Sequence, residues 1–302
     1  MKIKNRIRVG VIGPGKIGQD LCERILSDKD FELVSVISNN TSSQGLERFR
    51  TKIKYPINNG IMGVESKVME SMDGFFDCST AEAASNNWDY ISTRGKWLID
   101  LTPSNIGIPF IPFLPTHQSK PPTTLGPSMN FSMVSCGGQS SAPIISAICE
   151  NLEVVEEVEV SSSIAAQSAG LATRNNLDNY IHTTENMIRG LVNAESVKVI
   201  LVINPSNPPV FMRTTITVRG YGGNDESIKK SIASAISNFK KYVPGLEQIY
   251  ELIDAKNKIY TVSISIKGEG FYLPQFAGNL DIINLAALET ARIHISHLRI
   301  EI

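Results

Sequence analysis

The sequence predicts a two-domain α/β protein, in which an N-terminal doubly wound parallel sheet precedes an α+β domain with a mostly antiparallel sheet. Short β-rich segments alternate with helical segments between residues 7 and 102, and this alternation is typical of a parallel sheet. Longer strands, in which apolar and polar residues alternate, fill the chain beyond residue 150, as in antiparallel or mixed sheets. Residues 108–127 contain six prolines, which exclude a regular helix and mark a connection between the two patterns.

The first domain is predicted to span residues 1–130. Its strands are expected at residues 7–12, 31–38, 74–79 and 97–102. A helix follows the first strand, because Ile17, Leu21 and Ile25 recur at helical spacing, and another lies between the last two of these strands.

The second domain is predicted to span residues 131–277. Its strands are expected at residues 155–164, 197–204, 210–220 and 259–268. Helices at 175–193 and 226–241 each carry one apolar stripe, which indicates that they pack on one face of the sheet. A last helix, about residues 278–302, is expected to return to the first domain.

The composition indicates an ordinary soluble chain and excludes several classes of function. With 302 residues and a formal net charge of -1, no bulk attraction to nucleic acid or to an anionic membrane is expected. No apolar run reaches the roughly 18 residues of a spanning helix. The four cysteines form no CxxC pair, so no metal site is predicted, and reduced thiols in a cytoplasmic protein are expected.

A glycine loop follows the first predicted strand. Gly13, Gly15 and Gly18 form G-x-G-x-x-G between a strand and a helix, the context in which this motif binds the pyrophosphate of a dinucleotide in a Rossmann-type sheet. The alternative is a glycine turn in a fold that binds nothing. The predicted cofactor contacts in this domain are Gly13, Gly15, Lys16, Ile17, Gly18, Asn40, Ser79 and Thr80.

The second predicted strand ends without the acidic residue that binds the adenosine ribose in many dinucleotide sites. It ends in Asn39, Asn40, Thr41, Ser42 and Ser43. Arg48 and Arg50 follow, and hydroxyls, amides and an arginine can hold a 2'-phosphate. The loop therefore accepts NAD or NADP and slightly favours NADP; the alternative is a solvated loop without preference.

Cys136 precedes two glycines and a helical stretch, in the segment NFSMVSCGGQSSAP of residues 130–143. A thiol at a helix N-terminus gains thiolate character, and nearby backbone N–H groups can stabilise an oxyanion. The alternative is a buried structural cysteine. Cys22 and Cys149 have the apolar helical neighbours of core residues, and Cys78 lies at a strand end with no helix start.

The chain resembles the acetylating (CoA-acylating) acetaldehyde dehydrogenases that partner 4-hydroxy-2-oxovalerate aldolase. The resemblance runs in order through GPGKIGQDL, LIDLTPSNIG, the segment around Cys136, SAGLATRNNLD, INPSNPPVFMRTT and YLPQFAGNLDI. It implies a catalytic domain like that of glyceraldehyde-3-phosphate dehydrogenase, a homo-oligomer, an aldolase partner and coenzyme A as co-substrate. It further implies that Cys136 is the nucleophile and that Ser168, Ala169, Gly170 and Asn279 contact the cofactor.

The implied reaction interconverts a short-chain aldehyde plus CoA with an acyl-CoA through a cysteine thioester, with NAD or NADP as the redox cofactor. Two alternatives stay open. One is reduction of another activated acyl group, such as a carrier-protein thioester or an acyl phosphate. The other is a non-catalytic dinucleotide-binding partner of an aldolase.

The chain departs from the resembled pattern at several positions. Thr214 stands where the pattern has an aspartate that activates the cysteine, and His182 is either a substitute base or a surface or capping residue. Phe271 replaces a histidine, Leu171-Ala172 replaces Pro-Gly, and Asn40 stands in place of the ribose-binding acid. Arg174 either holds a phosphate or pairs with Asp178. Together these changes predict a divergent member whose acyl chain is its own.

Overall fold

The computed structural model describes residues 6–114, 127–170, 173–174, 176–254 and 256–300. The first sheet has seven parallel strands in the order β3-β2-β1-β4-β5-β7-β6. Their bounds are β1 Ile7–Ile12, β2 Phe31–Ile37, β3 Tyr55–Ile57, β4 Gly74–Asp77, β5 Trp97–Asp100, β6 Ile108–Pro109 and β7 Asn130–Ser132. The four predicted strands and the parallel sheet are confirmed, and β1 lies where the strand order reverses, the point at which such sheets bind ligands.

Three short strands of this sheet were not predicted. β3, β6 and β7 have two or three residues each, too few for a periodic pattern to emerge. β6 falls in the proline-rich stretch predicted to be only a connection, but it is the edge strand, where Pro109 interrupts no ladder. The structure thus shows an edge strand, β6, where the proline-rich composition predicts only a connection.

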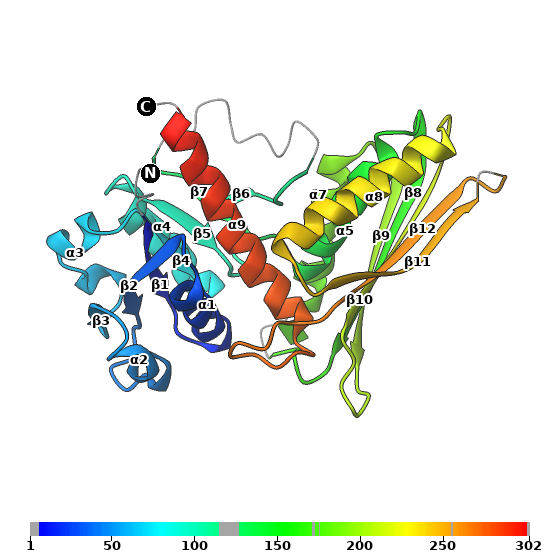
Figure 1. The fold of residues 1–302 in the computed structure, drawn as a ribbon. Helices are drawn as coiled ribbons and strands as arrows, with labels where there is room; N and C mark the ends of the chain where they lie inside the picture. Colours follow the sequence, from blue (N-terminus) through cyan, green and yellow to red (C-terminus); the bar gives the residue numbers. More distant parts are fainter. Residues whose placement is uncertain (1–5, 115–126, 171–172, 175, 255, 301–302) are drawn as a thin grey trace.

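Helices cover both faces of the first sheet (Figure 1). α1 Lys16–Ser27 packs Leu21 and Ile25 on one face, and α4 Ala81–Ser92 packs Ile91 on the other. The short helices have the bounds α2 Gln44–Phe49, η1 Ile61–Gly63 and α3 Ser66–Glu70. Their packing is the doubly wound arrangement that the sequence predicts.

The second sheet is mixed, with the strand order β11-β12-β10-β8-β9. Its strands are β8 Val154–Ala165, β9 Ala194–Asn204, β10 Met212–Tyr221, β11 Leu246–Asp254 and β12 Ile259–Ile266. Only β8 and β9 pair in parallel, so the mostly antiparallel sheet is confirmed. β11 was missed because it is an edge strand whose residues 247–252 are all exposed, which removes the alternation of buried and exposed positions.

Three helices cover one face of this second sheet: α5 Cys136–Cys149, α7 Leu177–Leu191 and α8 Asp225–Tyr242 (Figure 1). Among the described residues, no helix lies on the opposite face. The predicted helices at 175–193 and 226–241 correspond to α7 and α8. The helices therefore stand between the second sheet and the first domain.

α9 Gly278–Ile300 lies across the middle of the molecule and contacts α1 and β5 on one side and α5 and α8 on the other (Figure 1). The predicted boundary at residue 130 falls on the first residue of β7, which pairs with β5 in the first sheet. The assignment of residues 1–130 to dinucleotide binding and 131–277 to catalysis and oligomerisation remains a prediction.

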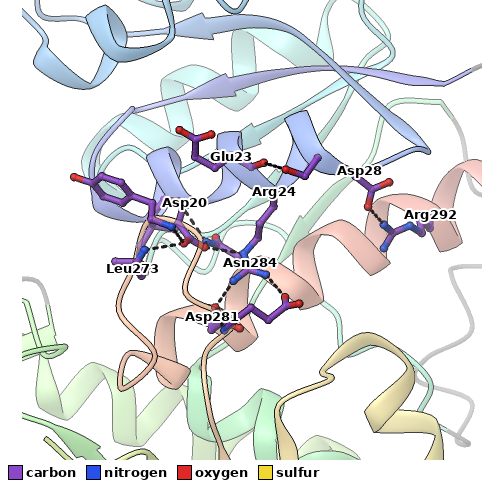
Figure 2. Close-up of polar contacts among 12 residues, drawn as sticks. Asp20, Glu23, Arg24, Asp28, Leu273, Asp281, Asn284 and Arg292 are labelled. Atoms are coloured by element: carbon purple, nitrogen blue, oxygen red, sulfur yellow. Dashed lines mark hydrogen bonds and ion pairs between the residues drawn. The ribbon is translucent and has the colours of Figure 1, made fainter.

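A buried ionic cluster fastens α9 to α1 (Figure 2). The Arg24 guanidinium faces three carboxylates: Asp20 at 2.7 Å, Glu269 and Asp281. Asp20 also accepts hydrogen bonds from the backbone N–H of Leu273 (2.9 Å) and from the side chain of Asn284 (2.9 Å). The cluster joins α1, α9 and the loop before α9, and it lies one helical turn from the glycine loop.

The described helices include none that is both long enough and apolar enough to cross a membrane.

Candidate active site

The glycine loop has the geometry that close approach of a ligand requires. Gly13 has φ 81°, and a Cβ there would lie 2.6 Å from the Ser79 backbone; a Cβ on Gly18 would lie 2.3 Å from the Gly13 carbonyl oxygen. Both glycines therefore permit the tight turn and the packing of α1. A Cβ on Gly15 would meet nothing within 4 Å, so the loop is open at the position where backbone can approach a pyrophosphate.

A cavity of about 480 Å³ lies over this loop. Its lining includes five of the predicted cofactor contacts: Gly15, Lys16, Ile17, Ser168 and Gly170. Ala169, buried at 6 % exposure, sits between the last two. The loop after β8 thus faces the glycine loop across one cavity, as a site for an extended dinucleotide requires.

Cys136 is the first residue of α5, and Ser135 is its N-cap: the Ser135 hydroxyl accepts a hydrogen bond from the Gly138 N–H at 2.9 Å. The Cys136 thiol lines a second cavity, of about 170 Å³, built from both domains. The two cavities share Ile17, Thr173 and Leu280. The thiol therefore lies beside the inner end of the candidate cofactor site.

Burial makes the Cys136 thiol less acidic than its position at a helix start predicts. It raises the pKa of Cys136 to about 11, while hydrogen bonds from Tyr180 and from the N–H groups of Gly137 and Cys136 itself lower it. The helix start thus acts in the predicted direction, but desolvation outweighs it. Of the N–H groups predicted to stabilise an oxyanion, that of Gly138 serves the cap and that of Gly137 faces the Tyr180 oxygen.

Asn279 fits a bound nicotinamide. Its side chain is buried at 3 % exposure and lines the Cys136 cavity, and its Oδ1 has no hydrogen-bond partner among the described residues. A buried amide oxygen without a partner is costly, and the carboxamide N–H of a nicotinamide would satisfy it. Asn279 lies in the first turn of α9, one residue after the helix begins.

Asn40, Ser79 and Thr80 are predicted cofactor contacts that line neither cavity. Ser79 donates to Asp77 through its N–H (2.9 Å) and its hydroxyl (2.5 Å), and Thr80 caps α4. Asn40 is exposed and accepts a hydrogen bond from the Ser42 N–H at 2.9 Å. Their contact with a cofactor stays a prediction.

The arginines predicted to favour a 2'-phosphate are already paired. Arg48 contacts Glu23 at 3.0 Å, and Arg50 contacts Glu47 at 2.6 Å. Both pairs are largely exposed and weak enough for a ligand to replace. The slight preference for NADP therefore stays a prediction.

The residues that depart from the resembled pattern lie in four different settings. Thr214 is buried at 1 % exposure and hydrogen-bonds the hydroxyls of Ser140 (2.9 Å) and Ser162 (3.2 Å). His182 is exposed and lines a separate cavity of about 610 Å³. Phe271 is 45 % exposed, with Arg24 over its ring. Leu171 and Ala172 lie outside the described residues.

Arg174 does not pair with Asp178 among the described residues, and its binding of a phosphate stays a prediction. Its guanidinium donates to the carbonyl oxygens of Ala169 (3.1 Å) and Ala166 (2.9 Å). It thus braces the loop that faces the cofactor cavity.

Tyr180 is the site residue that sequence reasoning missed. Its hydroxyl lies 3.9 Å from the Cys136 Sγ, and it lines the Cys136 cavity. The segment containing it was singled out, but for His182, and residues two apart on a helix point in nearly opposite directions. No local pattern in the sequence distinguishes Tyr180 from His182. The only signal available was that a helix expected to face the cysteine carries a tyrosine.

No group of three or more potential metal ligands occurs among the described residues. A Rossmann-type sheet joined to a mixed-sheet domain, with a cysteine where the two meet, defines a class of two-domain dinucleotide-dependent dehydrogenases. Aspartate semialdehyde dehydrogenase II from Vibrio cholerae, solved with ASA, has this fold with a TM-score of 0.62 at 11 % identity, over 98 % of this chain and 99 % of that one. The Candida albicans enzyme, solved with NADP, matches with a TM-score of 0.61 at 9 % identity, over 96 % and 99 %.

The chain belongs to the acetaldehyde dehydrogenase family. Acetaldehyde dehydrogenases of Burkholderia pseudomallei (strain K96243) and Pectobacterium atrosepticum are each 35 % identical to it, over 96 % and 98 % of both chains, respectively. Residues 136–274 match a family model described as prokaryotic acetaldehyde dehydrogenase, dimerisation, and residues 7–102 match the N-terminus of dihydrodipicolinate reductase. The protein is therefore an NAD(P)-dependent aldehyde dehydrogenase, and its dimerisation domain supports a homo-oligomer.

Proposed function

We propose that this enzyme interconverts an aldehyde plus CoA with an acyl-CoA through a thioester on Cys136. The observation that carries the proposal is the position of the thiol, at the start of α5 in a cavity continuous with the one over the glycine loop. Such a position brings a nucleophile, an aldehyde carbon and a dinucleotide within reach of one another.

In the proposed reaction, the Cys136 thiolate forms a C–S bond to the aldehyde carbon and gives a thiohemiacetal. Gly15, Lys16, Ser168 and Gly170 would hold the dinucleotide, and Asn279 would orient its carboxamide. A bound nicotinamide would supply the acceptor for the hydride that the carbon loses as the thioester forms. The CoA thiol then accepts the acyl group, which breaks the C–S bond and returns the Cys136 thiol.

The space next to the Cys136 cavity supports an acyl chain longer than acetyl. The Cys136 cavity shares Asn105, Val134, Asn179 and Thr183 with the neighbouring cavity of about 610 Å³. That neighbouring cavity is lined by apolar side chains, including Ile108, Ile111, Met187 and Leu191. An aldehyde of several carbons bound to Cys136 can extend into it and bury apolar surface.

The homo-oligomer is proposed to bury the open face of the second sheet. The side chains of Thr215 and Thr217 on that face bond Ser263 and Thr261 of β12 at 3.0 and 3.2 Å. Two ion pairs, Lys198–Glu159 at 3.7 Å and Arg219–Glu157 at 3.8 Å, lie beside these hydroxyls on the same face. Val202 of β9 adds apolar surface at 44 % exposure. A second copy of the chain is the proposed occupant; an aldolase partner and a cytoplasmic location rest on the resemblance and the composition.

The test is incubation of the purified protein with acyl-CoAs from acetyl to hexanoyl, followed by intact mass spectrometry of wild type and Cys136→Ala. We expect an acyl adduct on wild type, largest for chains beyond acetyl, and none on Cys136→Ala. Cys149→Ala is the matched control, because Cys149 is a buried cysteine at the other end of α5, and it should keep the adduct. A wild type that no thioester acylates would contradict the proposal and favour a carrier-linked acyl group or a non-catalytic role.

A further inference from the structure

Two cavities meet beside the Cys136 thiol, and they share a wall. The cavity of about 170 Å³ that contains the thiol and the neighbouring cavity of about 610 Å³ have four lining residues in common: Asn105, Val134, Asn179 and Thr183. A side chain that lines both cavities lies between them. A group bound to the thiol therefore has to pass this wall of four residues to reach the larger cavity.

The polar residues of the wall are joined by hydrogen bonds. The Asn105 Nδ2 donates to the Thr183 Oγ1 at 3.2 Å, and the Thr183 hydroxyl donates to the Asn179 Oδ1 at 3.5 Å. The Nδ2 groups of Asn105 and Asn179 each lie 3.5 Å from the Pro103 carbonyl oxygen. An amide nitrogen has two protons and a hydroxyl has one, so all four contacts can form together. The contact between Asn105 and Thr183 is the shortest, and the other three lie at the limit of hydrogen-bond length.

These contacts connect two elements that are far apart in the chain. Pro103 and Asn105 belong to the loop between β5 and β6, whereas Asn179 and Thr183 belong to α7. Asn105 and Thr183 are 78 residues apart. Asn105 is exposed and Thr183 is half-buried, so water can replace their bond when it breaks. The wall can therefore open without disrupting a helix or a strand.

The backbone of Asn105 has a conformation that asparagine tolerates. Its φ is 57°, in the left-handed region that asparagine adopts more readily than most residues with a side chain. Asparagine at this position thus makes the turn and also supplies the amide of the wall. Glycine adopts the same φ readily, so Asn105→Gly removes the amide and preserves the course of the loop.

We propose that Asn105 and Thr183 are specificity-determining residues, whose hydrogen bond closes the wall and opens only for a chain too long for the Cys136 cavity. The inference rests on the proposed function, in which such a chain is bound to Cys136. A short chain stays within the Cys136 cavity and leaves the bond intact. A longer chain breaks the bond and gains contact with the apolar lining of the larger cavity.

The test uses methyl and hexyl methanethiosulfonate, two reagents that place an alkyl chain directly on the thiol. The Cys136 thiolate attacks the sulfenyl sulfur, a disulfide bond forms, and methanesulfinate leaves with the electron pair of the broken S–S bond. Peptide mass spectrometry gives both rate constants at Cys136, and the readout is the hexyl-to-methyl ratio. A change in the pKa of the thiol affects both reagents alike and cancels in this ratio.

Thr183→Val keeps the shape of the side chain and removes its hydroxyl. We expect it to raise the ratio about two- to fivefold, as the loss of one neutral hydrogen bond implies. Asn105→Gly should raise the ratio further, because it also removes the side chain from the wall. Thr183→Ser, which keeps the hydroxyl, should match the wild type.

Asn186→Ala is the matched control, because Asn186 lines the larger cavity but not the Cys136 cavity; its ratio should equal that of wild type. Equal ratios for wild type, Thr183→Val and Asn105→Gly would overturn the inference. So would an equal rise in Asn186→Ala, which would attribute the ratio to the size of the larger cavity. A lower ratio in Asn105→Gly would also overturn it, since the amide would then bind the chain and not block it.

Acylation by thioesters separates this inference from the proposed function. A wild type that forms an acyl adduct, with equal reagent ratios in all variants, would overturn only the role of the wall. A wild type that forms no adduct, with higher ratios in Thr183→Val and Asn105→Gly, would overturn the acylating reaction and leave the wall in place.

Discussion

At the scale of single residues, the reactivity of Cys136 depends on opposing effects on the pKa of its thiol. Burial raises the pKa of its thiol to about 11, and the donors around it act in the opposite direction. A thiol in such a site is largely protonated at neutral pH until substrate or cofactor binding changes its surroundings. The small residues after it are therefore part of the site, since they decide which donors reach the sulfur.

Gly137→Ala should disrupt the site, whereas the same change at Gly190 of α7 should be tolerated. The added methyl would lie 2.1 Å from the Tyr180 hydroxyl, so we expect overpacking to lower the free energy of unfolding by about 1–3 kcal/mol. Alkylation of Cys136 should slow as Tyr180 is displaced. Urea unfolding and the alkylation rate measure the two effects.

Gly190→Ala is the control for this change. Gly190 is exposed on α7, and a Cβ there would meet nothing within 4 Å. The substitution should stabilise the helix by about 0.5–1 kcal/mol. If Gly137→Ala were as stable and as reactive as Gly190→Ala, the space next to Cys136 would not be what Tyr180 requires.

At the scale of elements, two helices determine where the site residues lie. The Ser135 cap of α5 contacts Thr184 of α7 at 2.6 Å, and Thr184 donates to the Tyr180 carbonyl at 2.7 Å. Because Thr184 has used its one proton, Ser135 is the donor in the first contact. The cap that begins the cysteine helix thus also holds the helix that presents Tyr180.

α9 is positioned by a cluster that contains more negative than positive charge (Figure 2). One guanidinium, Arg24, faces Asp20, Glu269 and Asp281. Burial raises the pKa of Asp281 to about 7, with Asp20 and Glu269 adding to the increase and Arg24 opposing it. The Asp281 Oδ2 is buried without a partner in the described part of the chain, a setting that suits a protonated oxygen.

Asp281 should make the protein less stable as the pH rises. Its folded pKa of about 7 exceeds the ordinary value of 3.8, so the folded state holds the proton more tightly between these values, and this contribution is lost as pH rises through about 7. Relative to Asp281→Asn, the wild type should lose roughly 1–3 kcal/mol of unfolding free energy between pH 5 and pH 8. Urea unfolding at both pH values measures this difference.

Asp89→Asn, at an exposed aspartate of α4, is the control and should follow the wild type at both pH values. If the unfolding free energies of wild type and Asp281→Asn changed equally with pH, Asp281 would be ionised at both pH values. Arg24 alone would then compensate the negative charge of the cluster.

At the scale of the whole molecule, the two sheets differ in how they are covered. The first sheet has helices on both faces, whereas the described helices of the second domain lie on one face of the second sheet (Figure 1). An uncovered sheet face of this size favours association, and the match of residues 136–274 to a dimerisation model agrees with it.

Thr217→Arg should weaken the homo-oligomer. Thr217 lies on the open face between Thr261 of β12, at 3.2 Å, and Glu159 of β8, and two-fold association would bury the long charged side chain of an arginine there. We expect a smaller mass by light scattering at micromolar concentration. Ser234→Arg, which adds the same charge to an exposed position of α8, should leave the mass unchanged; an unchanged mass for Thr217→Arg would place the interface elsewhere.

The sequence by itself determined the longer helices and strands and the glycine loop, whereas the choice of Cys136, which stays a prediction, also needed the family resemblance. Each of these depends on local signals: periodicity, glycine spacing, and small residues next to a thiol. The short strands β3, β6 and β7 and the edge strand β11 carry no such signal, because too few of their residues are alternately buried.

Only the tertiary structure decided what surrounds the cysteine. Tyr180, Ser162 and Thr214 come from α7, β8 and β10, three elements far apart in the chain that pack on α5. Tyr180 contacts Cys136, and Thr214 contacts Ser140 of α5 and Ser162. The same packing places His182 in the lining of the neighbouring cavity of about 610 Å³ and not in that of the Cys136 cavity, and it leaves the Asn40 loop outside the Cys136 and cofactor cavities. A hydrogen bond depends on the position of two atoms, and residues 44 and 52 apart acquire those positions only when the chain has folded.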